Sequence, residues 1–152
     1  MAVEILDETQ RYRPVDRLAR ALEALLAELG SADRDLTVVL VDDVAMHERN
    51  ARDRGVDGPT DVLSYPTVEP DDEGFPTIPH LGDIFISLDT AARQAGDRDV
   101  TLEHEVLVLA AHGLTHLRGF DHTSEAAWAP FRASERRILE LAGPAAAPEA
   151  GS

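Results

Sequence analysis

The segment from 112 to 122, HGLTHLRGFDH, carries three of the six histidines of the chain. On a helix, His112 and His116 stand four residues apart, so both side chains leave the same face one turn apart. This spacing allows two imidazoles to reach one metal ion. Gly119 can end a helix in the left-handed conformation without a Cβ penalty, so the chain can turn back. The pattern therefore predicts that His122 joins the first two histidines and that the three bind one metal ion.

The donor types narrow the choice of metal and site. The chain has no cysteine, so a transition-metal site must use His, Asp or Glu. Three neutral imidazoles with an open fourth position are typical of catalytic zinc, where bound water is acidified to a pKa of about 7. Asp121 is a possible fourth ligand that would close the site into a structural one, but we expect it to orient an imidazole instead. The alternative is that these are three ordinary histidines that bind no metal. That is the commoner explanation where a chain has only two histidines four residues apart.

The same histidine spacing occurs in zinc proteases of the metzincin type. Those enzymes place a glutamate after the first histidine as general base, whereas this chain has Gly113. Glu105 lies two helical turns upstream, too far to replace that glutamate. A metzincin-like zinc protease lacking the usual glutamate is therefore an alternative function, and we expect no peptide hydrolysis.

Composition predicts a single domain. A chain of 152 residues with 43% hydrophobic residues can bury its own core, and we assign residues 1–142 to one domain. The Pro- and Ala-rich residues 143–152 are expected to be a disordered tail. No apolar run approaches the roughly 20 residues that span a bilayer, so we expect no membrane contact and a cytoplasmic location.

The charge balance limits how nucleic acid can be held. Fourteen basic residues stand against 29 acidic ones, a net charge of −15, which opposes non-specific attraction to phosphate. Any contact with nucleic acid must therefore come from a local basic patch. The densest one before the histidines contains Arg49, Arg52 and Arg54.

Hydrophobic patterns predict an α+β fold with a small mixed β-sheet of about four strands packed with helices. Short apolar runs predict strands at 3–6, 36–43, 61–66 and 81–88. Helical spacing predicts helices at 16–29, 89–95, 102–117 and 125–141. The segment 66–80, with four Pro, one Gly and four acidic residues, is expected to be an exposed loop. The three-histidine zinc site then lies at the end of the central helix 102–117.

Several blocks of this sequence resemble the YbeY family of bacterial endoribonucleases. HGLTHLRGFDH is similar to the family's histidine signature, and three further blocks occur in the family's order: NARDRGVDGPTDVLSYP (50–66), LGDIFIS (81–87), and Glu135 with Ile138 and Leu139. Thr115 stands where the family usually has Leu, which should change packing beside His116 and not ligation. The resemblance covers most of the chain from about residue 50 to 141.

This resemblance implies a metal-dependent hydrolase: a zinc-dependent, single-strand-specific endoribonuclease in ribosomal RNA processing, notably small-subunit 3′-end maturation, and in ribosome quality control. The implied partners are single-stranded ribosomal RNA and the ribosomal small subunit, and no DNA. Carried over to this chain, His112, His116 and His122 bind one Zn²⁺, and Arg54 is catalytic. A rival function is a ribosome-associated binding protein with a structural zinc.

The chemistry of phosphoryl transfer agrees with a role for Arg54. Negative charge develops on the equatorial phosphate oxygens, and a planar guanidinium can hydrogen-bond two of them at once. The alternative is that Arg54 is a solvated loop residue, because runs of charge usually face water.

Overall fold

The computed structural model of the protein describes residues 3–67 and 80–143. They form one domain with a four-stranded sheet. The strands are β1 (Val3–Asp7), β2 (Asp35–Val41), β3 (Val62–Pro66) and β4 (His80–Ser87). The helices are α1 (Val15–Glu28), α2 (Asp43–Arg54), α3 (Leu88–Arg98), α4 (Leu102–Leu117) and α5 (Ala129–Ala142), with a short 3-10 turn, Ala126–Trp128, before α5.

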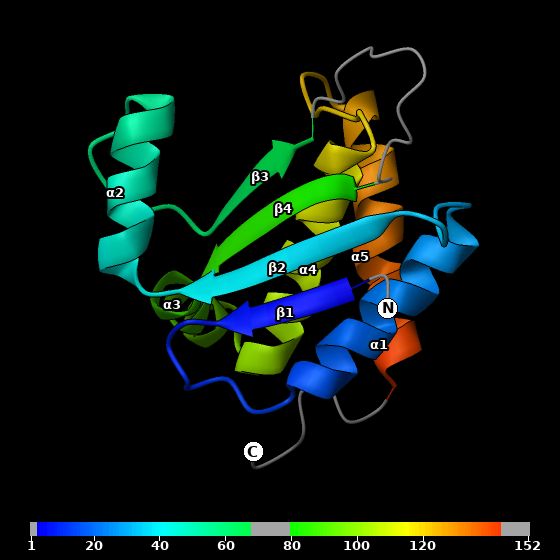
Figure 1. The fold of residues 1–152 in the computed structure, drawn as a ribbon, viewed down its shortest axis with the longest axis horizontal. Helices are drawn as coiled ribbons and strands as arrows, with labels where there is room; N and C mark the ends of the chain where they lie inside the picture. The colour runs from blue at the N-terminus through cyan, green and yellow to red at the C-terminus, as the bar shows by residue number, and fades with distance from the viewer. Residues whose placement is uncertain (1–2, 68–79, 144–152) are drawn as a thin grey trace.

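The sheet is mixed, as predicted. Its strand order is β1-β2-β4-β3, in which β1, β2 and β4 run parallel while β3 pairs antiparallel with β4 at one edge (Figure 1). The α+β prediction is therefore confirmed. Because β3 is an edge strand, one of its sides remains open to neighbouring side chains.

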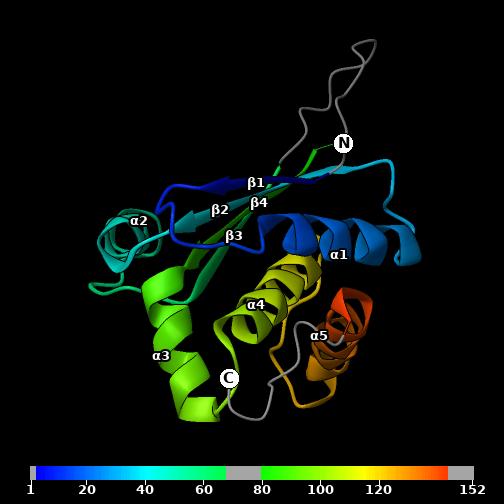
Figure 2. The same cartoon turned by 90° about the horizontal axis from the view of Figure 1, so that it is seen from below.

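The helices α1, α3, α4 and α5 lie on one face of this sheet (Figure 2). Successive strand residues point to opposite faces, so alternate positions enter two cores. The main core, under the helices, includes Val38, Leu40, Ile84 and Ile86. The smaller core on the opposite face contains Val39, Val41, Met46, Leu63 and Phe85. Helix α4 packs in the main core and carries His112 and His116 near its C-terminal end.

Helix α2 was not predicted from the sequence. Only Met46 and Asn50 of its residues are buried, so it lacks the apolar stripe that identifies an amphipathic helix. Asp42 caps its N-terminus by accepting a hydrogen bond from the amide of Ala45 at 2.9 Å. Arg54 is thus the last residue of a helix, so the alternative of a solvated loop arginine is wrong about the loop, although the residue is exposed.

The other helices follow the sequence closely. Helix α4 has the expected bounds, 102–117, whereas α3 runs three residues beyond the predicted 95. The last predicted helix divides into the 3-10 turn and α5, because Pro130 is tolerated only in the first turn of a helix. Most of the expected loop 66–80 and nearly all of the expected tail 143–152 lie outside the described residues. Within the described residues, no helix is both long and apolar enough to cross a membrane.

Candidate metal centre

The end of α4 turns the chain back as predicted. Gly119 has φ +97°, and its amide bonds to the carbonyl of His116 at 3.0 Å. The amide of Phe120 bonds to the carbonyl of Thr115 at 3.3 Å, completing the paired hydrogen bonds of a Schellman motif. A residue with a Cβ is disfavoured at this positive φ, so the glycine makes the reversal possible. The reversal returns the following segment to the face of α4 that carries the histidines.

The three histidines converge on one point. Their nearest ring nitrogens all lie within 4.8 Å of one another, so His112, His116 and His122 form a group that can hold a metal ion. The ring centroids are 4.8, 5.2 and 5.0 Å apart. Zinc binds imidazole nitrogen at about 2.0–2.1 Å, so small side-chain rotations bring all three donors to one ion. No other residue of the described chain belongs to this group.

Hydrogen bonds define which nitrogen of two imidazoles faces the site. His116 Nδ1 lies 3.1 Å from the carbonyl oxygen of Phe120, and His112 Nδ1 lies 3.2 Å from a carboxylate oxygen of Glu135. A carbonyl oxygen and an ionised carboxylate only accept hydrogen bonds, so each Nδ1 must carry the proton. In the neutral rings, Nε2 then holds the lone pair that a metal requires.

Burial favours the neutral form of one of these rings. The pKa of His116 is lowered below its usual value, first because burial penalises the charged form and second because His112 lies beside it. A neutral imidazole is the form that binds metal. The donor set therefore fits a divalent ion such as zinc.

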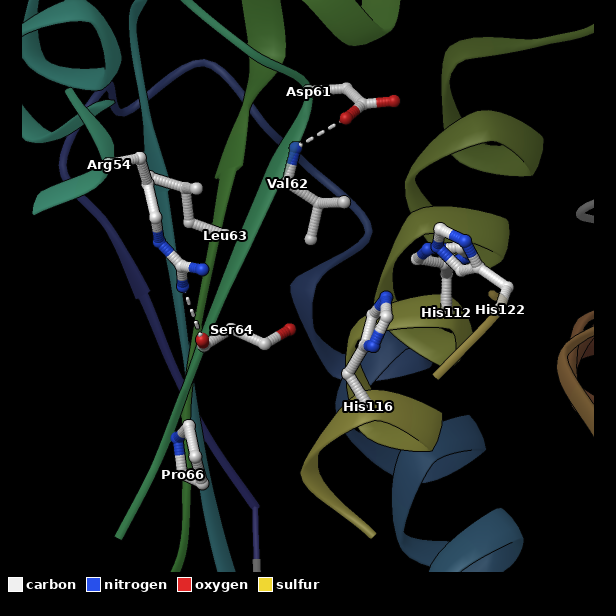
Figure 3. A pocket seen from close by; sticks show the side chains of 9 residues that line it. All are labelled: Arg54, Asp61, Val62, Leu63, Ser64, Pro66, His112, His116 and His122. Atoms are coloured by element: carbon white, nitrogen blue, oxygen red, sulfur yellow. Dashed lines mark hydrogen bonds between the residues drawn. The ribbon is translucent and has the colours of Figure 1, made fainter. Parts of the chain in front are cut away.

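Arg54 shares a pocket with all three histidines. The pocket has a volume of about 410 Å³ and is lined by Arg54, Asp61, Val62, Leu63, Ser64, Pro66, His112, His116 and His122. In Figure 3 the guanidinium of Arg54 reaches strand β3, where its Nη2 donates to the carbonyl of Ser64 at 3.0 Å. The histidines face the same strand from the side of α4 (Figure 3). The open side of β3 thus lies between a fixed cation and the metal-binding group.

The other two arginines of the predicted basic cluster have different surroundings. Arg52 donates two hydrogen bonds to the carboxylate of Asp53, at 2.9 and 3.2 Å. The guanidinium carbon of Arg49 lies 3.6 Å from the ring centroid of Phe85, a cation–π contact. Neither side chain lines the pocket. Of the three clustered arginines, Arg54 is therefore the one that reaches the pocket.

Gly113 marks a close approach between α4 and the sheet. A Cβ at this position would lie 2.8 Å from Cγ2 of Ile84 and 3.0 Å from Oγ of Ser64. Ser64 also donates a hydrogen bond to the carbonyl of Gly113 at 3.2 Å. A glutamate here would collide with β3 and β4, which is a steric reason for the missing protease general base. Glu105 is no substitute, because it is buried and paired with Arg98 at 2.9 Å.

Replacing Gly113 by alanine should destabilise the fold even though alanine favours helix. Overpacking costs about 1–3 kcal/mol, which outweighs the ~0.8–1 kcal/mol gained in helix propensity. Urea unfolding followed by circular dichroism measures the net change. Gly96 of α3 is the matched control, because a Cβ there meets no atom within 4 Å. Gly96→Ala should stabilise, and an equal gain for Gly113→Ala would contradict the close approach.

Two neighbouring carboxylates depart from the sequence expectations. Asp121 was expected to orient an imidazole, but its Oδ1 accepts the backbone amide of His122 at 2.8 Å. Glu135 of α5 holds the His112 ring instead. Sequence reasoning missed Glu135 as a site residue because it lies 23 positions from its partner and enters through helix packing. Thr115 is buried in α4, where its hydroxyl donates to the carbonyl of Ala111 at 2.8 Å.

The fold and the site together define an α+β protein with a three-histidine, metal-capable centre facing an arginine across one pocket. The family model described as Endoribonuclease YbeY matches residues 4–143. This chain belongs to the YbeY endoribonuclease family, which is a family of hydrolases.

Individual relatives agree with that assignment. Endoribonuclease YbeY of Thermus thermophilus is 54% identical over 127 residues, covering 84% of this chain and 90% of the relative. Endoribonuclease YbeY of Deinococcus radiodurans is 49% identical over 122 residues, covering 78% and 77%. The solution structure of a Thermotoga maritima protein superposes with a TM-score of 0.66 at 25% identity, covering 99% of both chains.

Proposed function

We propose that this chain is a zinc-dependent endoribonuclease that cleaves single-stranded ribosomal RNA. Its role would be small-subunit 3′-end maturation and ribosome quality control in the cytoplasm, on the ribosomal small subunit. One observation carries the proposal: Arg54 and the three histidines line the same pocket although they come from separate elements. A permanent cation opposite a group that can hold a metal ion is an arrangement that suits phosphodiester hydrolysis, because both can stabilise the negative charge of the transition state.

The residues of the chain divide the work of the reaction. His112, His116 and His122 would hold Zn²⁺, which supplies Lewis-acid stabilisation and acidifies water when bound. Arg54 would donate hydrogen bonds from its guanidinium to the phosphate oxygens. Its positive charge would stabilise the negative charge that develops there during attack. Its hydrogen bond to the carbonyl of Ser64 orients that guanidinium before substrate arrives. These roles make Arg54 and the histidines separable by mutation.

An open coordination position favours an enzyme over a structural zinc site. Within residues 3–67 and 80–143, the metal-capable group contains three histidines and no carboxylate. Asp121, the alternative fourth ligand, binds a backbone amide instead. A site with three protein ligands leaves room for a reacting oxygen.

The strongly acidic chain must bind RNA through local contacts. Arg54 forms no ion pair with any residue of 3–67 and 80–143, so no carboxylate of those residues neutralises its positive charge. Several other described arginines have one, including Arg17, Arg93, Arg98 and Arg137. Other described arginines such as Arg20 and Arg49 also form no ion pair between described residues, but of the described arginines it is Arg54 that lines the pocket, which supports an electrostatic contact there.

The proposal is tested by RNA cleavage with defined zinc content. The zinc-loaded protein should cut a single-stranded RNA and leave the same sequence in a duplex intact. Removal of zinc with a chelator should stop cleavage, and added zinc should restore it. A 2′,3′-cyclic phosphate end would identify the ribose 2′-hydroxyl as nucleophile, because attack on phosphorus then expels the 5′-oxygen. Zinc-dependent proteolysis of an unstructured peptide, with no cleavage of RNA, would overturn the proposal.

A further inference from the structure

Each imidazole of the metal centre is held in a different way. The His116 ring donates to the backbone carbonyl of Phe120 in the turn after its own helix. The His122 ring stacks on the indole of Trp128, with ring centroids 4.2 Å apart and planes inclined by 10°. The His112 ring alone of the three contacts a carboxylate of the described residues, that of Glu135. This third contact places a negative charge beside the metal centre.

Glu135 is positioned by the packing of α5 on α4. Phe131, Ser134 and Ile138 are the buried residues of α5, and Phe131 also lies against the rings of the three histidines. Side chains three and four residues apart share a helix face, so Glu135 lies beside this buried stripe. Its side chain is 25% exposed, and that of His112 is 17% exposed. The contact is therefore partly shielded from water.

An arginine that shares a cavity with Glu135 is paired with another acid, so the Glu135 carboxylate is available to His112. Arg98, which lines a second cavity together with Glu135, donates to both carboxylate oxygens of Glu105, at 3.2 and 2.9 Å. The pKa of Glu105 is raised, first by burial and also by repulsion from Asp61 and Glu135. Among ion pairs between described residues, Glu135 pairs with His112 and with no arginine. Packing of α5 thus brings Glu135 near a second acid, Glu105, and its charged partner among the described residues is His112.

We propose that Glu135 is a positioning residue for the metal centre. Its carboxylate accepts the Nδ1 proton of His112, which fixes the tautomer with a lone pair on Nε2 and holds the ring in the orientation that binds the ion. The negative charge also makes the imidazole a better electron donor. The inference rests on the proposed metal-dependent function, because an oriented Nε2 matters only if a metal binds there.

Metal affinity tests this role without any reference to cleavage. Loss of a hydrogen-bonded group behind a ligand typically weakens metal binding about 10–100-fold. Glu135→Ala should show this loss in zinc competition with a fluorescent chelator. Glu135→Gln should fall between Glu135→Ala and the unmodified protein, because an amide oxygen can still accept the proton but carries no charge. Glu140→Gln is the matched control on the same helix, since Glu140 contacts Arg137 instead.

The His112 tautomer in the metal-free protein gives an independent readout. Two-bond ¹H–¹⁵N correlation spectra distinguish the protonated nitrogen of a neutral imidazole. The His112 ring should be protonated on Nδ1 in the unmodified protein and in Glu140→Gln, and should shift toward Nε2 protonation in Glu135→Ala. A purely structural role for Glu135 would lower thermal stability and leave this tautomer unchanged.

The outcomes separate this inference from the proposed function. Zinc bound by the unmodified protein, with the same affinity and the same His112 tautomer in Glu135→Ala, would overturn the positioning role alone. Failure of the unmodified protein to bind zinc would overturn the metal-dependent function, and with it the reason for positioning His112. Weaker zinc binding together with a changed tautomer establishes Glu135 as the positioning residue.

Discussion

Replacing any one of His112, His116 and His122 by alanine is expected to prevent the protein from retaining one zinc ion per chain. The three nitrogens lie within 4.8 Å of one another and form the complete metal-capable group of the described residues. Two imidazoles hold zinc much more weakly than three, so the loss should exceed the ~10–100-fold seen when a group behind a ligand is removed. Elemental analysis of the purified variants measures the zinc content.

His47→Ala is the matched control for this experiment. His47 lies on α2, where its Nε2 is 2.7 Å from a carboxylate oxygen of Asp57, outside the pocket. Its replacement should leave zinc content unchanged. Circular dichroism of the metal-free proteins checks that each variant folds. Stoichiometric zinc in folded His122→Ala would remove the third ligand and leave the site with two histidines.

Replacing Arg54 by alanine is expected to abolish most cleavage while leaving zinc binding intact. The Arg54 side chain lines the pocket, and its guanidinium hydrogen-bonds the carbonyl of Ser64 and lies near the ring of Tyr65. It forms no hydrogen bond with any of the three histidines. Loss of one group that stabilises developing negative charge typically costs about 100- to 1,000-fold in rate. Stability should change by about 1 kcal/mol or less, because an exposed cation in the last turn of a helix contributes about 0.3–1 kcal/mol. Single-turnover cleavage of a single-stranded RNA measures the chemical step.

Two further variants sharpen the test of Arg54. Arg54→Lys should recover only part of the rate, since an ammonium keeps the charge and loses the planar two-pronged geometry. Arg20→Ala removes an exposed arginine of α1 that does not line the pocket, and it should cleave at the normal rate. If Arg54→Ala cleaves as fast as the unmodified protein, Arg54 has no catalytic role and another group must stabilise the phosphate charge.

Local patterns in the sequence predicted the metal-binding group. A separation of four residues places His112 and His116 on one face of any α-helix, whatever packs around it. Gly119 follows the end of that helix with a positive φ, which glycine adopts easily because it has no Cβ. This preference is a property of the residue itself. The apolar runs that became β1, β2 and β4 are likewise properties of short segments. Each of these features depends on residues close together in the chain, so the sequence alone was sufficient.

Other features depended on contacts between distant segments. Helix α2 has too few buried residues for a periodic signal, so Arg54 appeared to lie in a loop. Only the packing of α4 on β3 and β4 shows that a Cβ at Gly113 would collide with Ile84 and Ser64. The histidine spacing therefore showed that Gly113 stands where metzincin-type proteases have their glutamate. The packing of α4 explained why a larger residue does not fit at this position.

The composition of the pocket belongs to the tertiary structure. Arg54 and His112 are 58 positions apart in the sequence, and no local periodicity relates the end of α2 to the face of α4. Their meeting follows from the edge position of β3, which leaves one side of the strand open between them. Glu135 reaches His112 through the packing of α5 on α4. The sequence by itself thus determined which imidazoles can share an ion, because helical spacing is local. Only the folded chain decided which cation and which carboxylate accompany them, because those neighbours are set by long-range packing.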